Sequence, residues 1–151
     1  MLAATIDVAR AQNYLAGLPD KIDASVLKAM FRAVIELQSY IRANKLHGDP
    51  LHQRSGNLSR ETLTQPDPYR SGNTIIGTVG TSRAAYYGKV HEDGGTYDIP
   101  EHYSMSRKGR KFIVRPHQAT FPQRSYLRSA LAENVGHITE VVRGAVQEAI
   151  Q

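Results

Sequence analysis

The stretch YGKVHEDGGTYDIPEH, residues 87–102, crowds histidines and carboxylates around a pair of glycines. Its first half, together with the residues just before it, predicts a short helix over about 84–92. Gly94 and Gly95 set the end of that helix, because glycine adopts the left-handed backbone conformation that caps a helix. The pair His91–Glu92 then lies in the last helical turn, where both side chains can contact neighbouring elements.

The same stretch also offers nitrogen and oxygen ligands for a metal ion or a hydrolytic site. The candidate ligands are His91, Glu92 or Asp93, His102 and His117. Their spacing matches no established motif, because the helical zinc motif needs two histidines four residues apart with a glutamate between them. A structural role for this turn is therefore the favoured hypothesis, and a metal-dependent hydrolase is kept as an alternative.

The composition is that of one globular domain covering residues 1–151. The chain has no cysteine, which excludes disulfides, thiolate chemistry and thiolate zinc sites. No apolar run approaches the roughly 18 residues needed to cross a membrane, and Asp7 interrupts the apolar start that a signal peptide needs. We therefore expect cytosolic synthesis and no membrane partner. The formal net charge of +5 mildly favours an anionic partner.

Two amphipathic helices are predicted, one toward each end of the chain. In the first, apolar residues recur at spacings of three and four over 22–41, with Asp20 as the N-cap after a proline. In the second, the same spacing runs over 127–149. We expect Leu37 and Leu131 to be buried between the two helices and the strands.

The middle of the chain predicts β-structure, because prolines gather there and break helices. Strands are predicted at 73–81, 95–100 and 111–115, where β-branched and aromatic residues lie between turn residues. A long polar link over 52–72 holds one helical turn. Residues 101–111 form an exposed insertion between two of the strands.

That insertion carries a cluster of four cations, Arg107, Lys108, Arg110 and Lys111. We expect it to be an exposed loop or hairpin tip, because burying unpaired charges is prohibitive. The cluster could contact phosphates, although no aromatic platform or helix-turn-helix pattern accompanies it. For a protein that acts alone, a solvated loop is favoured over a DNA contact, and a small nucleic-acid-binding protein is kept as a further alternative. For a subunit of a ring, a contact with a neighbouring subunit or an adjacent ring is favoured over a DNA contact.

The order of four short segments resembles a known family. The segments are SGNL (55–58), YYGKVHEDGG (86–95), FIVRP (112–116) and FPQRSYLRSAL (121–131). They resemble the tail-completion and head–tail joining proteins of tailed phages, including the Mu-like virion morphogenesis proteins and lambdoid minor tail components. The chain departs from that pattern with Gly88 where alanine is common, Ser125 where proline is common, and a long basic insertion near 103–111.

The resemblance implies an α+β fold, in which a small twisted, mainly antiparallel sheet packs with a long N-terminal helix and a C-terminal helix. It implies a ring, usually a hexamer, that completes the tail or joins it to the head, either as a neck component or as the tail terminator proper. The implied partners are copies of this chain and the adjacent neck, connector and tail tube proteins. A transient contact with DNA that moves through the channel of the ring is also possible. The implied location is the virion, after synthesis in the host cytoplasm.

No catalytic residue, metal or cofactor is implied by this resemblance. It assigns instead a structural turn and interface motif around the opening stretch and the start of the last helix. The residues of this motif are Tyr87, His91, Glu92, Gly94, Gly95, Arg124, Tyr126 and Leu127.

Overall fold

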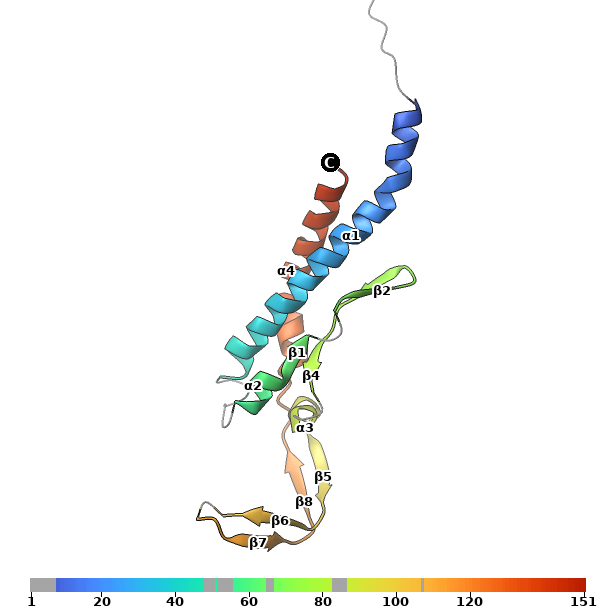
Figure 1. Ribbon diagram of the computed structural model, residues 1–151. Helices are drawn as coiled ribbons and strands as arrows, with labels where there is room; N and C mark the ends of the chain where they lie inside the picture. Colours follow the sequence, from blue (N-terminus) through green and yellow to red (C-terminus); the bar gives the residue numbers. More distant parts are fainter. Residues whose placement is uncertain (1–7, 48–50, 52–55, 65–66, 83–86, 107) are drawn as a thin grey trace, which may run out of the picture.

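The computed structural model describes the chain except for residues 1–7, 48–50, 52–55, 65–66, 83–86 and 107. The fold is α+β, as predicted, with a long helix toward each end and short strands and helices between them (Figure 1). The helical elements are α1 (Val8–Tyr40), a π-helical turn η1 (Ile41–Lys45), α2 (Asn57–Glu61), α3 (Tyr87–Asp93) and α4 (Leu127–Ala149). The short helices α2 and α3 agree with the predicted helical turns.

The two long helices lie side by side and run in opposite directions (Figure 1). Near the start of α1, the Tyr14 hydroxyl donates a hydrogen bond of 3.1 Å to the carbonyl of Ile150, beyond the end of α4. At the end of α1, the Tyr40 hydroxyl donates at 2.6 Å to the carboxylate of Glu133, near the start of α4. Apolar residues at helical spacing let each helix cover a stripe of the other.

The first helix begins much earlier than the sequence predicted. Asp20 is not its N-cap, because α1 starts at Val8 and passes through Pro19. An internal proline removes one backbone hydrogen bond and bends a helix. Figure 1 accordingly shows α1 changing direction in its blue N-terminal third. Helical residues on both sides of Pro19, and the contact of Tyr14 with the end of α4, offset that loss.

The described strands form separate two-stranded antiparallel pairs and not the single twisted sheet that was expected. The pairs are β1 (Thr62–Thr64) with β4 (Val79–Thr81), β2 (Tyr69–Ser71) with β3 (Thr74–Ile76), β5 (Gly95–Ile99) with β8 (His117–Phe121), and β6 (His102–Met105) with β7 (Lys111–Val114). The strands predicted at 95–100 and 111–115 are thus present as β5 and β7.

The single strand predicted at 73–81 is wrong, because it is divided at Gly77 into β3 and β4. At this glycine the backbone passes against α1, and an added Cβ would lie 2.5 Å from Cγ2 of Val34. The residues on the two sides of this contact pair with different strands, β3 with β2 and β4 with β1. The close approach to α1 therefore interrupts the strand.

The strands β5 to β8 form an arm that leaves the helical body (Figure 1). Its outer part, which we call the arm hairpin, comprises β6, β7 and the turn between them, residues 102–114. Pro100 and Pro116 lie at the junction between the β5–β8 pair and the arm hairpin. Proline has no backbone donor, so the ladder of hydrogen bonds cannot continue across this junction. The hairpin therefore turns away from the β5–β8 pair.

The core lies where α1, η1 and the start of α4 meet. Its buried cluster consists of Leu37, Ile41, Leu46, Leu51, Tyr126 and Ala130. Leu37 is buried as predicted, but Leu131 is 50% exposed, so that part of the prediction is wrong. The apolar spacing of α4 indicates correctly which residues share a face, but only part of that face is covered by this chain.

Candidate functional site

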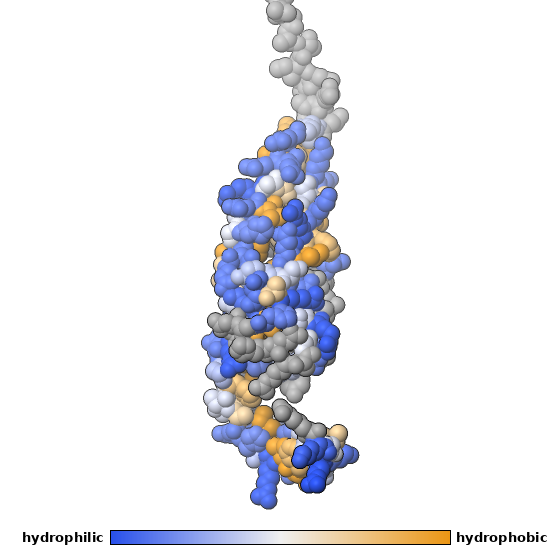
Figure 2. All heavy atoms as spheres, turned by 90° about the vertical axis from the view of Figure 1, so that its left-hand side faces the viewer, coloured by the Kyte–Doolittle hydropathy of each residue, from blue (hydrophilic) through white to orange (hydrophobic). Residues whose placement is uncertain are grey.

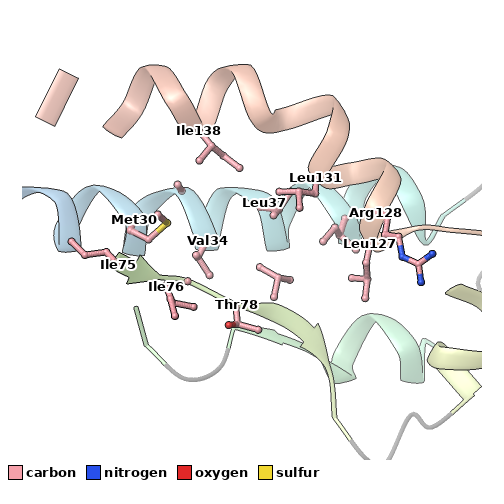
Figure 3. A pocket seen from close by; sticks show the side chains of 14 residues that line it. Met30, Val34, Leu37, Ile75, Ile76, Thr78, Leu127, Arg128, Leu131 and Ile138 are labelled. Atoms are coloured by element: carbon pink, nitrogen blue, oxygen red, sulfur yellow. The ribbon is translucent and has the colours of Figure 1, made fainter. Parts of the chain in front are cut away.

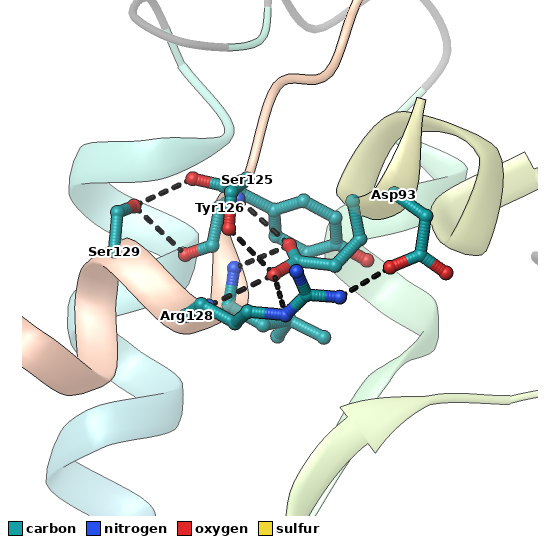
Figure 4. A network of polar contacts seen from close by, with 7 residues as sticks. Asp93, Ser125, Tyr126, Arg128 and Ser129 are labelled. Carbon is teal, nitrogen blue, oxygen red and sulfur yellow. Dashed lines mark hydrogen bonds and ion pairs between the residues drawn. The ribbon is translucent and has the colours of Figure 1, made fainter. Parts of the chain in front are cut away.

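The centre of the predicted motif is Glu92, which caps the N-terminus of α4 from a different helix. The first backbone N–H groups of a helix have no acceptor within the helix itself. The backbone nitrogens of Tyr126, Leu127 and Arg128 donate to the Glu92 carboxylate at 2.8, 2.9 and 3.0 Å. The Ser125 hydroxyl donates to the same group at 2.7 Å (Figure 4). One side chain therefore joins α3 to the start of α4.

The environment of Glu92 stabilises its charged form. Burial by itself raises the pKa of a carboxyl group, and Glu92 is 7% exposed. The hydrogen bonds from Ser125 and the three backbone N–H groups outweigh that effect, so the pKa of Glu92 is lowered. The positive end of the helix dipole acts in the same direction. Arg128 adds an ion pair to Glu92 and a second one to Asp93.

The two glycines end α3 as predicted, and one of them also allows a close contact. Gly94 has φ +64° and donates its N–H to the Val90 carbonyl at 2.9 Å, while Gly95 has φ +117°. The Gly94 backbone packs against Gln123, where an added Cβ would lie 2.6 Å from the backbone nitrogen. The backbone nitrogen of Arg124 donates at 2.7 Å to the His91 carbonyl. The segment before α4 is thus held against the end of α3.

Tyr126, just before α4, is completely buried in the core cluster. Burial raises the pKa of Tyr126 to about 12, and the neighbouring Thr81 hydroxyl opposes this effect. Among the described residues, no group meets hydrogen-bond geometry with the Tyr126 hydroxyl. That hydroxyl lies over Gly88, where an added Cβ would be 2.8 Å from the phenol oxygen. The absence of a side chain at Gly88 therefore makes room for Tyr126.

Gly88→Ala is expected to lower the free energy of unfolding by about 1–3 kcal/mol, because overpacking a filled core costs that much. The added methyl group would also meet Leu58 and Thr81, each at 3.0 Å. Gly144→Ala in α4 is the matched control, since an added Cβ there meets nothing within 4 Å. The control should gain up to about 1 kcal/mol from helix propensity. Urea denaturation of both variants measures the difference, and equal stabilities would contradict the role of Gly88.

His91 packs against Tyr87 on α3, whereas the other two predicted histidine ligands, His102 and His117, lie on the strands β6 and β8. The His91 ring packs edge-on against Tyr87, with ring centroids 6.3 Å apart. Burial, with a smaller contribution from the charge of Arg124, lowers the pKa of His91. His102 and His117 instead make local contacts with the carbonyls of Pro100 and Arg115.

The hypothesis of a metal site is not supported by these positions. Within the described part of the chain, no three histidine, aspartate or glutamate side chains are grouped so that they could hold a metal ion. The carboxylate of Glu92 is engaged by the four donors at the start of α4. The histidines His91, His102 and His117 lie on α3, β6 and β8, in different parts of the arm and its base.

Of the basic cluster, Lys108 and Arg110 lie in the turn of the arm hairpin and Lys111 begins the strand β7. Lys108, Arg110 and Lys111 are exposed, whereas Arg107 lies outside the described residues. The turn is closed by hydrogen bonds from the Ser106 nitrogen to the Arg110 carbonyl and from the Gly109 nitrogen to the Ser106 carbonyl, each 2.9 Å long. The first part of the expected insertion, His102–Met105, forms the strand β6 and pairs with β7, so of the two predicted forms, a loop or a hairpin, the insertion is a hairpin.

A second candidate site is an apolar groove between α1, α4 and the β3–β4 segment, with a volume of about 500 Å³ (Figure 3). Figure 3 shows Val34 and Leu37 of α1, Leu131 and Ile138 of α4, and Ile76 of β3 around this space. Leu131 and the nearby Val135 are half exposed. We call this feature the body groove.

The predicted motif included Glu92 and two of its donors, Tyr126 and Leu127, but not the donors Ser125 and Arg128, and the body groove was not predicted. Ser125 carried a usable signal, since serine just before an apolar helical run is typical of a helix start. No sequence signal marks the body groove, because its lining comes from three separate segments whose apolar residues are equally typical of a closed core.

The described part of the chain contains no helix that is both long and apolar enough to span a membrane. Comparison of the chain with models of protein families, with curated proteins and with solved structures finds no match.

Proposed function

We propose that this protein is a structural subunit of a homo-oligomeric ring in the tail or neck of a tailed phage. One observation carries the proposal: the folded chain leaves two apolar surfaces uncovered, the body groove and one face of the arm hairpin. Large exposed apolar patches are rare on proteins that act as monomers, and they mark interaction surfaces. The resemblance of four sequence segments to tail-completion and head–tail joining proteins supports the placement in a virion.

The α3–α4 junction supports a structural role for the motif that first suggested chemistry. Glu92 holds the start of α4 with both carboxylate oxygens. A catalytic carboxylate needs a free oxygen within reach of its substrate. The same contacts connect the arm, which continues from α3, to the helical body. The motif is therefore suited to setting the position of the arm.

The proposal is tested by the mass and shape of the purified protein. Sedimentation velocity and native mass spectrometry should show a closed oligomer, expected to contain six copies. Electron microscopy should show that this oligomer is a ring with a central channel. A protein that stays monomeric as its concentration is raised would contradict the proposal, because mass action favours association at high concentration. Portal, connector and major tail genes beside the gene for this chain would support the placement in a virion.

Binding to DNA is the second candidate function, and the exposed cations of the arm hairpin favour it. The hairpin also exposes Tyr103 and Phe112, which could stack on bases. Titration of DNA at several salt concentrations separates the two functions. Tight binding by a monomer with a steep salt dependence would indicate a nucleic-acid-binding protein, whereas a ring with weak, salt-sensitive binding agrees with DNA passing through a channel.

A further inference from the structure

We infer that the arm hairpin, together with Arg115 at its base, is a binding site for double-stranded DNA that holds the duplex through its phosphates. This inference rests on the second candidate function, DNA binding, and assigns its residues and the form of its ligand. It does not depend on the number of copies in the assembly, so its failure is distinguishable from the failure of the proposed ring.

The net charge of the chain is concentrated in this segment. The chain has 19 basic and 14 acidic residues. Residues 102–115 contain five of the basic residues and none of the acidic ones, so the rest of the chain balances at 14 residues of each sign. The five cations are Arg107, Lys108, Arg110, Lys111 and Arg115. A polyanion is therefore attracted to this segment, whereas the balanced remainder of a second copy has no net charge to complement it.

The side chains of the described cations are free to meet phosphates. Lys108, Arg110, Lys111 and Arg115 are all exposed. The ion pairs in the described part of the chain join residues of α1, η1, β2, α3 and α4, and none involves these four cations. The turn is closed through the backbone nitrogen of Arg110, which donates at 3.0 Å to the Ser106 hydroxyl. The fold therefore holds the turn in place without using these charged groups.

The arm carries these cations away from the helical body. The hairpin lies beyond the β5–β8 pair (Figure 1), and Figure 2 shows strongly hydrophilic side chains beside hydrophobic ones at this lower end of the molecule. Arg115 follows Lys111 by four residues, which is about 14 Å of extended chain. Duplex DNA carries one phosphate charge per about 1.7 Å of its axis, so a row of cations of this length can contact several phosphates at once.

The register of the hairpin favours a duplex over a single strand. Tyr103 pairs with Ile113, and Ser104 pairs with Phe112. Consecutive residues of a strand point to opposite faces, so the two exposed aromatic rings, of Tyr103 and Phe112, lie on opposite faces of the hairpin. Proteins that bind single strands stack successive bases on several aromatic side chains along a basic groove. One ring on each face provides no such platform, and the phosphate contacts therefore dominate.

Two other anionic partners fit this hairpin less well. Entry into a bilayer by the turn would bury Lys108 and Arg110, which is prohibitive. An acidic protein would need several unpaired carboxylates at the spacing of the cations, whereas a duplex presents a continuous row of phosphates. The apolar face formed by Tyr103, Met105 and Ile113 stays available for the subunit contacts of the proposed ring.

Binding of a short fluorescent DNA duplex of mixed sequence, followed by anisotropy at several salt concentrations, tests the inference. The logarithm of the binding constant should fall linearly with the logarithm of the salt concentration, with a slope of about 4–5 per bound copy, because each phosphate contact contributes about 0.9. A variant with Lys108→Gln, Arg110→Gln and Lys111→Gln should lose about 3 from this slope and more than about tenfold in affinity at low salt. Arg115→Gln alone should lose about 1 from the slope.

The matched control removes the same number of charges from the helices. It carries Lys28→Gln, Lys89→Gln and Arg143→Gln, which replace exposed residues of α1, α3 and α4. The control should keep the slope and the affinity of the wild type. The circular dichroism of both triple variants should match that of the wild type, because all six side chains are exposed. Equal losses in the two triple variants would show that binding follows net charge alone, which overturns the assigned site.

The remaining outcomes separate this inference from the proposed functions. A wild-type protein that does not bind the duplex at low salt overturns the inference and the second candidate function but not the ring. Tighter binding of single-stranded DNA of the same length overturns the form of the ligand. Tighter binding of phosphatidylserine vesicles or of polyglutamate overturns the assignment to nucleic acid. A monomer that binds the duplex as expected contradicts the ring alone.

Discussion

Glu92→Gln is expected to lower the free energy of unfolding by about 3 kcal/mol, because hydrogen bonds to a charged group contribute about 1.5–3 kcal/mol each and several are lost or weakened together. The variant keeps the size of the side chain but replaces one acceptor oxygen with a donor group. The backbone N–H groups of Tyr126, Leu127 and Arg128 then compete for one oxygen. Chemical denaturation followed by circular dichroism measures the loss.

The neighbouring Asp93→Asn is the matched control. Asp93 also pairs with Arg128, but its side chain is 37% exposed, and among the described residues no backbone N–H of α4 donates to it. Exposed ion pairs contribute at most about 1 kcal/mol. A loss in Asp93→Asn as large as that in Glu92→Gln would show that charge near Arg128, and not the cap on α4, stabilises the junction.

The contribution of Glu92 should also depend on pH in a defined direction. Its pKa is lowered in the folded protein, relative to about 4.3 in an unfolded chain. Protonation therefore favours the unfolded state, so the stabilisation is complete above the unfolded value and is lost as the pH falls through the folded one. Glu36 and Glu133, whose pKa values are also lowered, remain in both proteins. The stability difference between the wild type and Glu92→Gln should shrink in acid and stay constant near neutrality.

Gly94→Ala is expected to have a similar or larger effect, about 2–5 kcal/mol, from left-handed backbone strain and overpacking together. Gly94 has φ +64°, and its added methyl group would lie 2.6 and 2.8 Å from the backbone nitrogen and Cα of Gln123. Backbone atoms cannot rotate away, so the end of α3 would have to move from the segment before α4. That movement also separates Glu92 from its donors.

Gly109→Ala separates the two contributions. Gly109 has a similar φ of +74°, but nothing lies within 4 Å of an added Cβ. Gly109→Ala should therefore lower the free energy of unfolding only by the cost of the left-handed conformation, about 1–2 kcal/mol. Thermal unfolding of both variants checks this, since 1 kcal/mol shifts the midpoint by about 2–4 °C in a protein of this size. Equal shifts would mean that the contact with Gln123 is not tight.

Local chemistry determined several elements of this protein, and the sequence predicted them. Glycines that must adopt positive φ end α3, and apolar spacing without an internal proline marks α4. The exposed basic turn follows from four cations in five residues, which cannot be buried. Each of these features depends on residues within one or two turns of the chain, so a pattern read along the sequence is sufficient.

Tertiary structure decided the remaining features. The donors that hold Glu92 lie more than 30 residues away, and the division of the strand at Gly77 depends on contact with Val34. Pro19 is accommodated inside α1, next to a segment that reaches the end of α4. Apolar spacing shows which residues share a face but not what covers it. The sequence therefore predicted Leu131 to be a core residue, while in the fold Leu131 lines an open groove. The arm formed by β5 to β8 extends away from the helical body and does not cover this groove.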